Sequence, residues 1–355
     1  MSELAVIRVG AFSGSGTSLR DALAEKVTLH DFDFSSAARR PSLWPTRLRA
    51  LFEAARVGDD VPFSKTAAWS RGLERTLPPS LLARPALFIQ TSPALQLDPK
   101  VCYGIYTDRL GREGQAGQGA FRSRATQGWV EREQRFVERA RRLFVMGPTT
   151  REYAINEYGL DPSRIVVVGG APNTKLGPRR MSTECRRLLF VGVDWRRKGL
   201  PDLLEAFAAV RATHGELTLD VIGGVPNAPA PPGVNIIGRV PHSQMPGHFS
   251  QSDLLVIPTH AEPFGIALVE ALTMGIPVIG TTVGNQEWII GTGGYTVKPG
   301  DTDSLSAAIR RAVDDYPALK AKAELRSDEL KETMTWERIA ERILSELLND
   351  QVCGP

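Results

Sequence analysis

Short apolar segments alternate with helical patterns along most of this 355-residue chain, and this alternation constrains the fold more than any other feature. The segments at residues 4–9, 86–90 and 142–146 are strand-like in a first series, and those at 187–191 and 217–222 begin a second. Strands that are apolar on both faces and alternate with helices predict parallel sheets covered by helices on both sides. A chain of this length is expected to form two domains rather than one.

A stretch rich in glycine and proline, residues 169–178, separates the two series and predicts the connection between domains. We therefore expect one domain with a parallel sheet over residues 1–170 and a second over residues 171–334. A final helix is expected over residues 335–355, because Thr335 is a good N-cap and apolar residues follow it at helical spacing.

Composition narrows the class of protein. Hydrophobic residues make up 42% of the chain, charged residues 23%, and the net charge is only +3. No basic run is interleaved with aromatic residues, so we expect no nucleic-acid partner.

The cysteines and histidines lack metal-ligand spacing, so we expect no metal site. The three cysteines, Cys102, Cys185 and Cys353, are scattered along the chain, which predicts reduced thiols and a cytoplasmic location. The N-terminus does not resemble a signal peptide, and no apolar run approaches the roughly 18 residues of a membrane span.

Two carboxylates flank the start of a predicted helix in the second series. Glu262 precedes and Glu270 follows the helix start at about Gly265, and apolar strands are expected at residues 253–258 and 276–279. At about 1.5 Å rise per helical residue, the two carboxylates lie roughly 8–12 Å apart. The helix start offers backbone N–H groups and a positive dipole end, which suit phosphate. This pattern predicts a strand-end crevice for a ligand with hydroxyls at both ends and phosphate between them, as in a sugar nucleotide.

A basic loop follows the strand expected at residues 187–191. It contains Arg196, Arg197 and Lys198 and ends at Gly199. Fixed cations at the carboxyl end of a strand would stabilise a departing diphosphate more in the transition state than in the ground state. A solvated basic turn is the alternative interpretation, above all for Arg197.

The run from Glu262 to Glu270 resembles the E-x7-E signature of retaining GT-B glycosyltransferases, specifically glycosyltransferase family 4, also called glycosyl transferases group 1. Three further segments resemble that family: residues 189–199, 238–240 and 293–301. The resemblance is strong over about residues 144–348 and loose over the first 140 residues. It implies an α/β GT-B fold, in which two Rossmann-like domains face each other across a cleft and the C-terminal helix crosses back to the first domain.

The resemblance also implies a function. A protein of this family would move a sugar from a nucleotide diphosphosugar, bound by the second domain, to an acceptor hydroxyl bound by the first. The reaction would retain the anomeric configuration, would need neither metal nor cofactor beyond the co-substrate, and would serve polysaccharide or glycoconjugate biosynthesis. The acceptor would be a carbohydrate, a lipid-linked sugar or a small molecule. A sugar-nucleotide epimerase of similar fold and a non-catalytic sugar-nucleotide-binding protein are the alternatives.

Residue roles follow from the same resemblance. Glu270 is expected to bind the nucleotide ribose and Glu262 the donor sugar, because carboxylates accept bonds from paired hydroxyls. Phe264, Gly265 and Ile266 are expected to present backbone N–H groups to sugar hydroxyls and the outer phosphate. Core packing is an equal alternative for the Phe264 side chain.

The basic loop and a later segment complete the expected donor site. Lys198 matches the family's lysine. The family's arginine falls at Val193 in this chain, so Arg196 or Arg197 must replace it, and Arg196 is preferred. Arg239 and Val240 resemble the segment beside the nucleotide base.

The first series offers weaker candidates. The loop of residues 10–17 lacks the G-x-G-x-x-G and P-loop patterns, but Gly14 and Gly16 would allow a ligand to approach the backbone closely. A plain strand–helix connection is the alternative. Asp108 is a candidate to orient the acceptor hydroxyl or to sense the donor sugar, with an Asx-turn cap as its alternative. His30 is the other candidate for lining the site, and a surface position is preferred for it.

Residues 39–56 contain five arginines together with Trp44, Leu48, Leu51 and Phe52. An amphipathic helix lying on a membrane could bring the protein to a lipid-linked acceptor by peripheral contact. A helix that turns its apolar residues into the core and its basic residues outward is the preferred interpretation.

Overall fold

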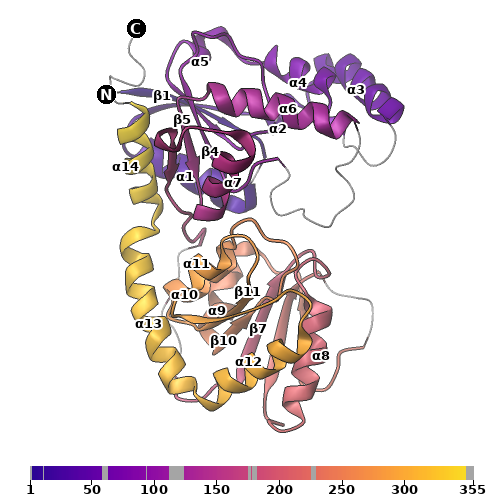
Figure 1. Ribbon diagram of the computed structural model, residues 1–355, viewed down its shortest axis with the longest axis vertical. Coiled ribbons are helices and arrows are strands. Elements are labelled where there is room, and N and C mark those ends of the chain that lie inside the picture. The colour runs from indigo at the N-terminus through magenta and orange to yellow at the C-terminus, as the bar shows by residue number, and fades with distance from the viewer. Residues whose placement is uncertain are drawn as a thin grey trace. The chain divides into compact units, whose positions relative to one another are not determined.

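The computed structural model describes residues 2–10, 12–57, 63–92, 94–111, 124–174, 177, 182–224 and 229–348. Contacts divide the chain into two compact units (Figure 1). The first comprises residues 1–169 and 336–355, and the second comprises residues 170–335.

The first unit is built on a six-stranded sheet in the order β2-β1-β3-β4-β5-β6, and every pair of neighbours is parallel. Its strands are β1 (Glu3–Arg8), β2 (Thr28–Asp33), β3 (Ala86–Ile89), β4 (Tyr103–Thr107), β5 (Arg142–Val145) and β6 (Ile165–Val167). Its helices are α1 (Ser15–Ala24), α2 (Phe34–Ala37), α3 (Trp44–Val57), α4 (Ala67–Glu74), α5 (Pro79–Leu82), α6 (Arg124–Arg139), α7 (Pro148–Tyr158) and α14 (Trp336–Leu347).

Helix α14 belongs to the first unit although it lies at the far end of the sequence. It packs against α1 and β5. Two ion pairs fix it there: Lys26 Nζ lies 2.8 Å from a carboxylate oxygen of Glu341, and Arg142 Nε lies 3.3 Å from one of Glu346. The apolar face of α14 is buried in this packing, which is why a short amphipathic helix is stable here.

The second unit repeats the plan with a parallel sheet in the order β12-β11-β10-β7-β8-β9. Its strands are β7 (Arg187–Gly192), β8 (Thr218–Gly223), β9 (Val234–Gly238), β10 (Leu254–Val256), β11 (Val278–Thr281) and β12 (Gly294–Val297). Its helices are α8 (Leu200–Arg211), α9 (Met245–Gln251), α10 (Ile266–Thr273), α11 (Gln286–Ile290), α12 (Thr302–Asp314) and α13 (Tyr316–Thr333). Figure 1 shows α8 and α12 on one side of this sheet and α10 and α11 on the other.

Burial explains why the strands were visible in the sequence. Residues 4–7 of β1 and 254–256 of β10 are fully buried, as strands covered on both faces must be. The edge strand β2 is only half-buried and carries polar residues, so its apolar signal is weak. The prediction of parallel sheets with helices on both faces is confirmed.

Two sequence interpretations are wrong. Helix α3 does not turn its large apolar residues into the core, because Trp44 and Phe52 are 64% and 71% exposed. Its inner face is made of small and polar residues instead, among them the buried Ala50. The thiols are not all reduced either: Cys185 is a buried thiol outside any disulfide, but Cys102 is disulfide-bonded. Spacing along the sequence does not say which thiols meet in space. Cys353 lies outside the described residues.

Within the described part of the chain, no helix is both long enough and apolar enough to span a bilayer.

Candidate functional site

The second sheet changes direction between β7 and β10. From β7 the chain adds β8 and β9 on one side, whereas β10, β11 and β12 extend the other side. Loops that follow two such strands leave the sheet in opposite directions and open a crevice at its carboxyl edge. The basic loop follows β7 and the Glu262 loop follows β10, so the topology places both at this crevice.

Charged side chains join the two loops. The Lys198 ammonium group donates a hydrogen bond to the Glu262 carboxylate, and these side chains are only 16% and 14% exposed. A guanidinium nitrogen of Arg197 lies 3.6 Å from the same carboxylate oxygen. Because the pair is largely shielded from water, its attraction is stronger than that of a surface ion pair. Two cations and one carboxylate are thereby held together at the crevice.

Hydrogen bonds to the backbone also join the basic loop to the Glu262 loop. The Arg197 carbonyl accepts hydrogen bonds from the His260 N–H at 2.8 Å and from the Thr259 hydroxyl at 3.0 Å. Gly199 has a φ of +76°, and a Cβ there would lie 2.0 Å from the Pro258 carbonyl oxygen. Only glycine permits both this conformation and this approach. The basic loop therefore keeps a fixed position against the end of β10.

The structure separates the two arginine candidates. Arg196 is exposed, and its guanidinium lies over the Trp195 ring at 4.5 Å. Arg197, which the sequence analysis placed second, is the arginine that contacts Glu262. The turn determines this outcome, because the Lys198 N–H bonds to the Asp194 carbonyl and winds successive side chains in different directions. Spacing alone carries no signal of that rotation.

The Glu262 loop leads directly into α10. Gly265 has a φ of +111° and precedes the helix, and no side chain caps this N-terminus. The Phe264 side chain is 2% exposed, and its ring centroid lies 6.4 Å from that of Trp288. The ring is therefore core, as its alternative interpretation held, and only its backbone can meet a ligand. Ile266 begins the helix.

One supporting residue of the site, Asn285, was not predicted from the sequence. Asn285 follows β11, and its side-chain amide donates a 2.7 Å hydrogen bond to the carbonyl of Pro263. This bond holds the loop between Glu262 and Gly265 in position. The Gly284-Asn285 pair after an apolar strand was the available signal, since such pairs mark a turn at a strand end.

Glu270 lies in α10 with its side chain buried. Burial raises the pKa of Glu270 to about 7, against the opposing effect of hydrogen bonds from the Asn173 N–H and the Thr174 hydroxyl. Those donors lie 3.2 and 3.5 Å from the carboxylate. A carboxylate that is shielded from solvent in this way can bind hydroxyl groups strongly, because water competes little for its oxygens.

The remaining candidates of the second unit lie along the same edge. Arg239 and Val240 follow β9, which is two strands from β7. Arg239 is exposed and Val240 is half-buried. All expected donor-site residues thus lie at the carboxyl edge of one sheet, although they span residues 196–270 of the sequence.

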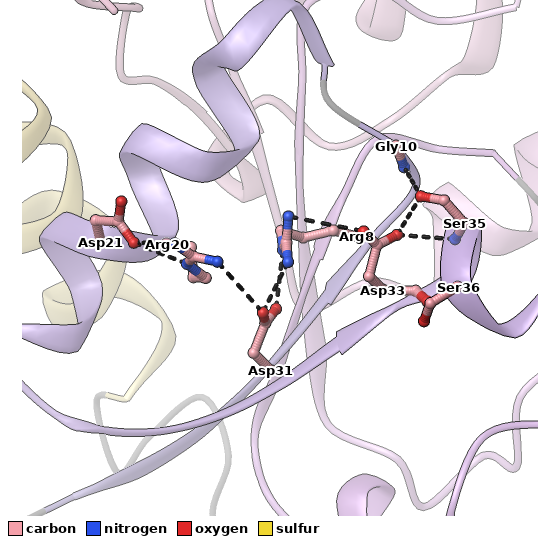
Figure 2. A network of polar contacts seen from close by, with 8 residues as sticks. All are labelled: Arg8, Gly10, Arg20, Asp21, Asp31, Asp33, Ser35 and Ser36. Carbon is pink, nitrogen blue, oxygen red and sulfur yellow. Dashed lines mark hydrogen bonds and ion pairs between the residues drawn. The ribbon is translucent and has the colours of Figure 1, made fainter.

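The first sheet has an equivalent switch between β1 and β3. The glycine loop follows β1, with Gly14 at φ +90° before α1 and Gly16 buried in its first turn. Figure 2 shows how the loop is held: the Gly10 N–H donates to the Ser35 hydroxyl at 3.1 Å, and Ser35 in turn donates to Asp33. The entry to the loop is therefore fixed by side chains from β2 and α2.

Arg8 lies between Asp31 and Asp33 (Figure 2). Its guanidinium donates to both carboxylate oxygens of Asp31, at 2.8 and 2.7 Å, and lies 4.0 Å from Asp33. Burial acts to raise the pKa of Asp33, but hydrogen bonds from Ser35 and the charge of Arg8 outweigh it and lower the pKa below its usual value. Asp33 therefore stays ionised as an acceptor for Ser35.

Asp108 and His30 lie in different places on the first sheet. Asp108 follows β4 at the carboxyl edge, and its carboxylate accepts a 3.1 Å hydrogen bond from the Gln90 side chain, which follows β3. His30 lies within β2, and its ring nitrogen is 3.3 Å from Glu3, the first residue of β1. Of the two, only Asp108 is near the strand ends where ligands bind.

No group of three or more His, Cys, Asp or Glu side chains suited to a metal ion occurs among the residues that were described.

Known proteins resemble this chain in sequence and in fold. The sequence pattern of the family described as Glycosyl transferases group 1 matches residues 185–315. The second unit contains a group 1 glycosyltransferase domain. The chain is 26% identical over 208 residues to the glycogen synthase of Mycobacterium tuberculosis, covering 55% of this chain and 48% of that protein. It spans about half the length of the curated relatives that it matches.

Solved structures match both units. Sucrose-phosphate synthase from Thermosynechococcus elongatus has a TM-score of 0.67 at 17% identity, over 97% of each chain. Anabaena HepE, solved in complex with UDP, has a TM-score of 0.63 at 14% identity, over 98% of this chain and all of that one. The predicted α/β fold of the GT-B class is thereby confirmed, and the group 1 domain supplies its second sheet.

Proposed function

We propose that this protein is a retaining, metal-independent glycosyltransferase that moves a sugar from a nucleotide diphosphosugar to an acceptor hydroxyl. One observation carries the proposal: Lys198 and Arg197 meet Glu262 where the two loops of the switch point converge. Such a cluster offers cations for a diphosphate and a carboxylate for sugar hydroxyls within one crevice. It lies inside the segment that matches the group 1 family.

Each side chain is assigned a part of the donor. Glu270, whose carboxylate is buried, accepts hydrogen bonds from the ribose hydroxyls, and the segment of Arg239 and Val240 lies beside the base. The N-terminus of α10 from Gly265 onward receives the outer phosphate, because its N–H groups and dipole favour anions. Glu262 binds the sugar.

The cations assist the departure of the nucleoside diphosphate. The bond from the anomeric carbon to the diphosphate oxygen breaks, and a bond from that carbon to the acceptor oxygen forms on the same face. The acceptor proton passes to the departing phosphate oxygen. Lys198 and Arg197 stabilise the charge that grows on the diphosphate, which is the contribution a divalent ion makes in metal-dependent enzymes. Before the donor binds, Glu262 serves as their counter-ion.

The acceptor is assigned to the first unit. Gly14 and Gly16 offer backbone close to the end of β1, and Asp108 offers a carboxylate at the end of β4. Asp108 is the group best placed to orient an acceptor hydroxyl. A carbohydrate, lipid-linked or small-molecule acceptor fits this proposal.

A donor panel tests the proposal. The protein is incubated with nucleotide diphosphosugars and mixed acceptors in the presence of a metal chelator, and release of nucleoside diphosphate is measured. We expect release that depends on both substrates, with the product's anomeric configuration retained when read by NMR. Donor binding without release in any acceptor mixture would support the non-catalytic alternative. Conversion of the sugar without transfer would support the epimerase.

A further inference from the structure

Helix α3 carries the largest group of exposed apolar side chains on any described element. Trp44, Leu48, Leu51 and Phe52 are 64%, 52%, 46% and 71% exposed. At 3.6 residues per turn, these four positions fall within an arc of about 100° on the helix surface. A contiguous stripe of large apolar side chains on a protein surface marks an interaction site.

The opposite face of α3 is committed to the first unit. Thr46 packs so closely on α4 that a Cβ at Gly72 would lie 2.2 Å from its methyl carbon. The Glu53 carboxylate accepts hydrogen bonds from the N–H groups of Ala67 and Ala68, at 3.0 and 3.1 Å, and so caps the start of α4. The helix therefore cannot rotate to bury its stripe. Figure 1 shows α3 beside α4 at one end of this unit.

Positive charge borders the stripe on both sides. Arg47 and Arg49 are exposed, and at about 100° per residue they project on opposite sides of the apolar arc. Arg39 and Arg40, also exposed, precede the helix. Glu53 is the single acidic residue among residues 39–57, and it faces α4. The outer face is thus apolar at its centre and basic at its rims.

We propose that this outer face of α3 docks the protein on a membrane surface rich in anionic lipid headgroups. Large apolar side chains insert at the boundary between headgroups and acyl chains, while arginines bind the phosphates around them. The proposal concerns the first unit alone, and it does not depend on the proposed transfer reaction.

Charge and geometry favour a membrane over two other occupants. A protein groove that takes an amphipathic helix encloses much of the helix surface, whereas α3 is already fixed to α4 by Thr46 and Glu53. A second copy of the chain docked stripe to stripe would place arginine rims against arginine rims, and like charges facing each other oppose association. A flat anionic membrane can take up the apolar stripe and bind the arginines on both sides of it at the same time.

Vesicle sedimentation tests the proposal with the full chain and without donor or acceptor. Wild type is expected to sediment with vesicles of phosphatidylcholine and phosphatidylglycerol, and much less with phosphatidylcholine alone. The double variant Trp44→Ser/Phe52→Ser should lower the affinity for the anionic vesicles about tenfold or more. Arg47→Glu/Arg49→Glu should also lower it about tenfold or more, because each cation near an anionic surface strengthens binding several-fold.

Matched controls come from α13 in the second unit. Leu325→Ser removes an apolar side chain that is 66% exposed, and Lys322→Glu reverses an exposed charge, so both should bind vesicles as wild type does. Circular dichroism and a melting curve establish that each variant is folded. The proposal is overturned if wild type does not sediment with anionic vesicles or if the α3 variants bind them as tightly as wild type does. It is also overturned if wild type is a dimer in solution that Trp44→Ser/Phe52→Ser separates into monomers.

Discussion

The two units share one plan but use charge differently at the carboxyl edges of their sheets. In the second unit, Lys198, Arg197 and Glu262 meet where the loops after β7 and β10 converge. In the first unit, Asp33 lies 4.0 Å from Arg8 and accepts a hydrogen bond from Ser35, whose hydroxyl accepts one from the Gly10 N–H of the glycine loop. The charged groups of the second unit join two loops at the proposed donor site, whereas those of the first unit position the backbone after β1.

Under the proposed function, this difference assigns the two substrates to different units. A diphosphate needs fixed cations, and the second unit has two of them in its crevice. An acceptor hydroxyl is neutral and needs orientation more than charge, which suits the first unit's glycine loop and Asp108. Two parallel six-stranded sheets of similar plan therefore do not imply identical ligands, because function depends on the side chains at the strand ends.

The largest effect is expected at Lys198. Lys198→Ala removes a cation from the departing diphosphate and should lower the turnover of nucleoside diphosphate release about 100- to 1,000-fold, with a smaller change in donor affinity. Lys322→Ala, on the exposed surface of α13, is the matched control and should behave as wild type. Unchanged turnover in Lys198→Ala would remove the distinction between the two units.

Glu270 should make stability depend on pH. Its pKa is about 7 in the folded chain and ordinarily 4.5, so between these values the folded state keeps a proton that the unfolded state has released. The free energy of unfolding should therefore fall as the pH rises through this window. Glu270→Gln removes the charge and should stabilise the protein by up to about 3 kcal/mol above neutral pH, with no gain at acid pH.

Urea denaturation of wild type and Glu270→Gln, at a pH below 4.5 and at another above 7, measures this effect. The exposed Glu332→Gln on α13 is the control and should show no such pH dependence. An equal difference between wild type and Glu270→Gln at both pH values would contradict the raised pKa.

The next largest effect is expected for nucleotide affinity when Glu270 is replaced. Above pH 7, where Glu270 is ionised, Glu270→Ala removes the charged acceptor proposed for the ribose hydroxyls and should weaken nucleoside diphosphate binding by about 1.5–3 kcal/mol. Isothermal titration calorimetry measures the change. Asp108→Ala in the first unit serves as the comparison, and we expect it to leave nucleotide affinity unchanged. If both variants weakened binding equally, the assignment of the nucleotide to the second unit alone would fail.

The two neighbouring arginines sharpen the comparison within the second unit. Arg197→Ala should lower turnover about tenfold, because its guanidinium lies at the Glu262 cluster. Arg196→Ala should have a smaller effect, since that side chain lies over Trp195. The same release assay ranks them, and the reverse order would restore the preference drawn from the sequence.

The smallest effect is expected in the first unit. Ser35→Ala removes the acceptor of the Gly10 N–H and should lower the free energy of unfolding by about 0.5–1.5 kcal/mol. Ser36→Ala is a close control, because the Ser36 hydroxyl donates only to the Asp33 carbonyl at the start of its own helix. Thermal unfolding compares them. Equal loss in both variants would show that the network does not hold the loop.

Particular elements show how much the sequence could predict. The apolar segment at residues 187–191 and the helix pattern after it predicted β7 and α8, because a strand covered on both faces leaves a continuous apolar run. The loops carrying Lys198 and Glu262 could be assigned to strand ends for the same reason. Long-range contacts were not predictable. The Gly284-Asn285 pair marks a turn after β11 but not the bond from Asn285 to Pro263, and the bond from Asn173 to Glu270 has no local signature.

The amino-acid sequence by itself determined the strand and helix order, the parallel sheets and the position of charged residues at strand ends, because these depend on local periodicity and on the rule that ligands meet the carboxyl edge. Only the tertiary structure decided that Arg197 rather than Arg196 meets Glu262, that Glu270 is buried, and that α3 exposes its apolar stripe. Each of these depends on the direction in which a side chain leaves a turn or helix. That direction is set by packing against residues distant in sequence, and periodicity does not encode it.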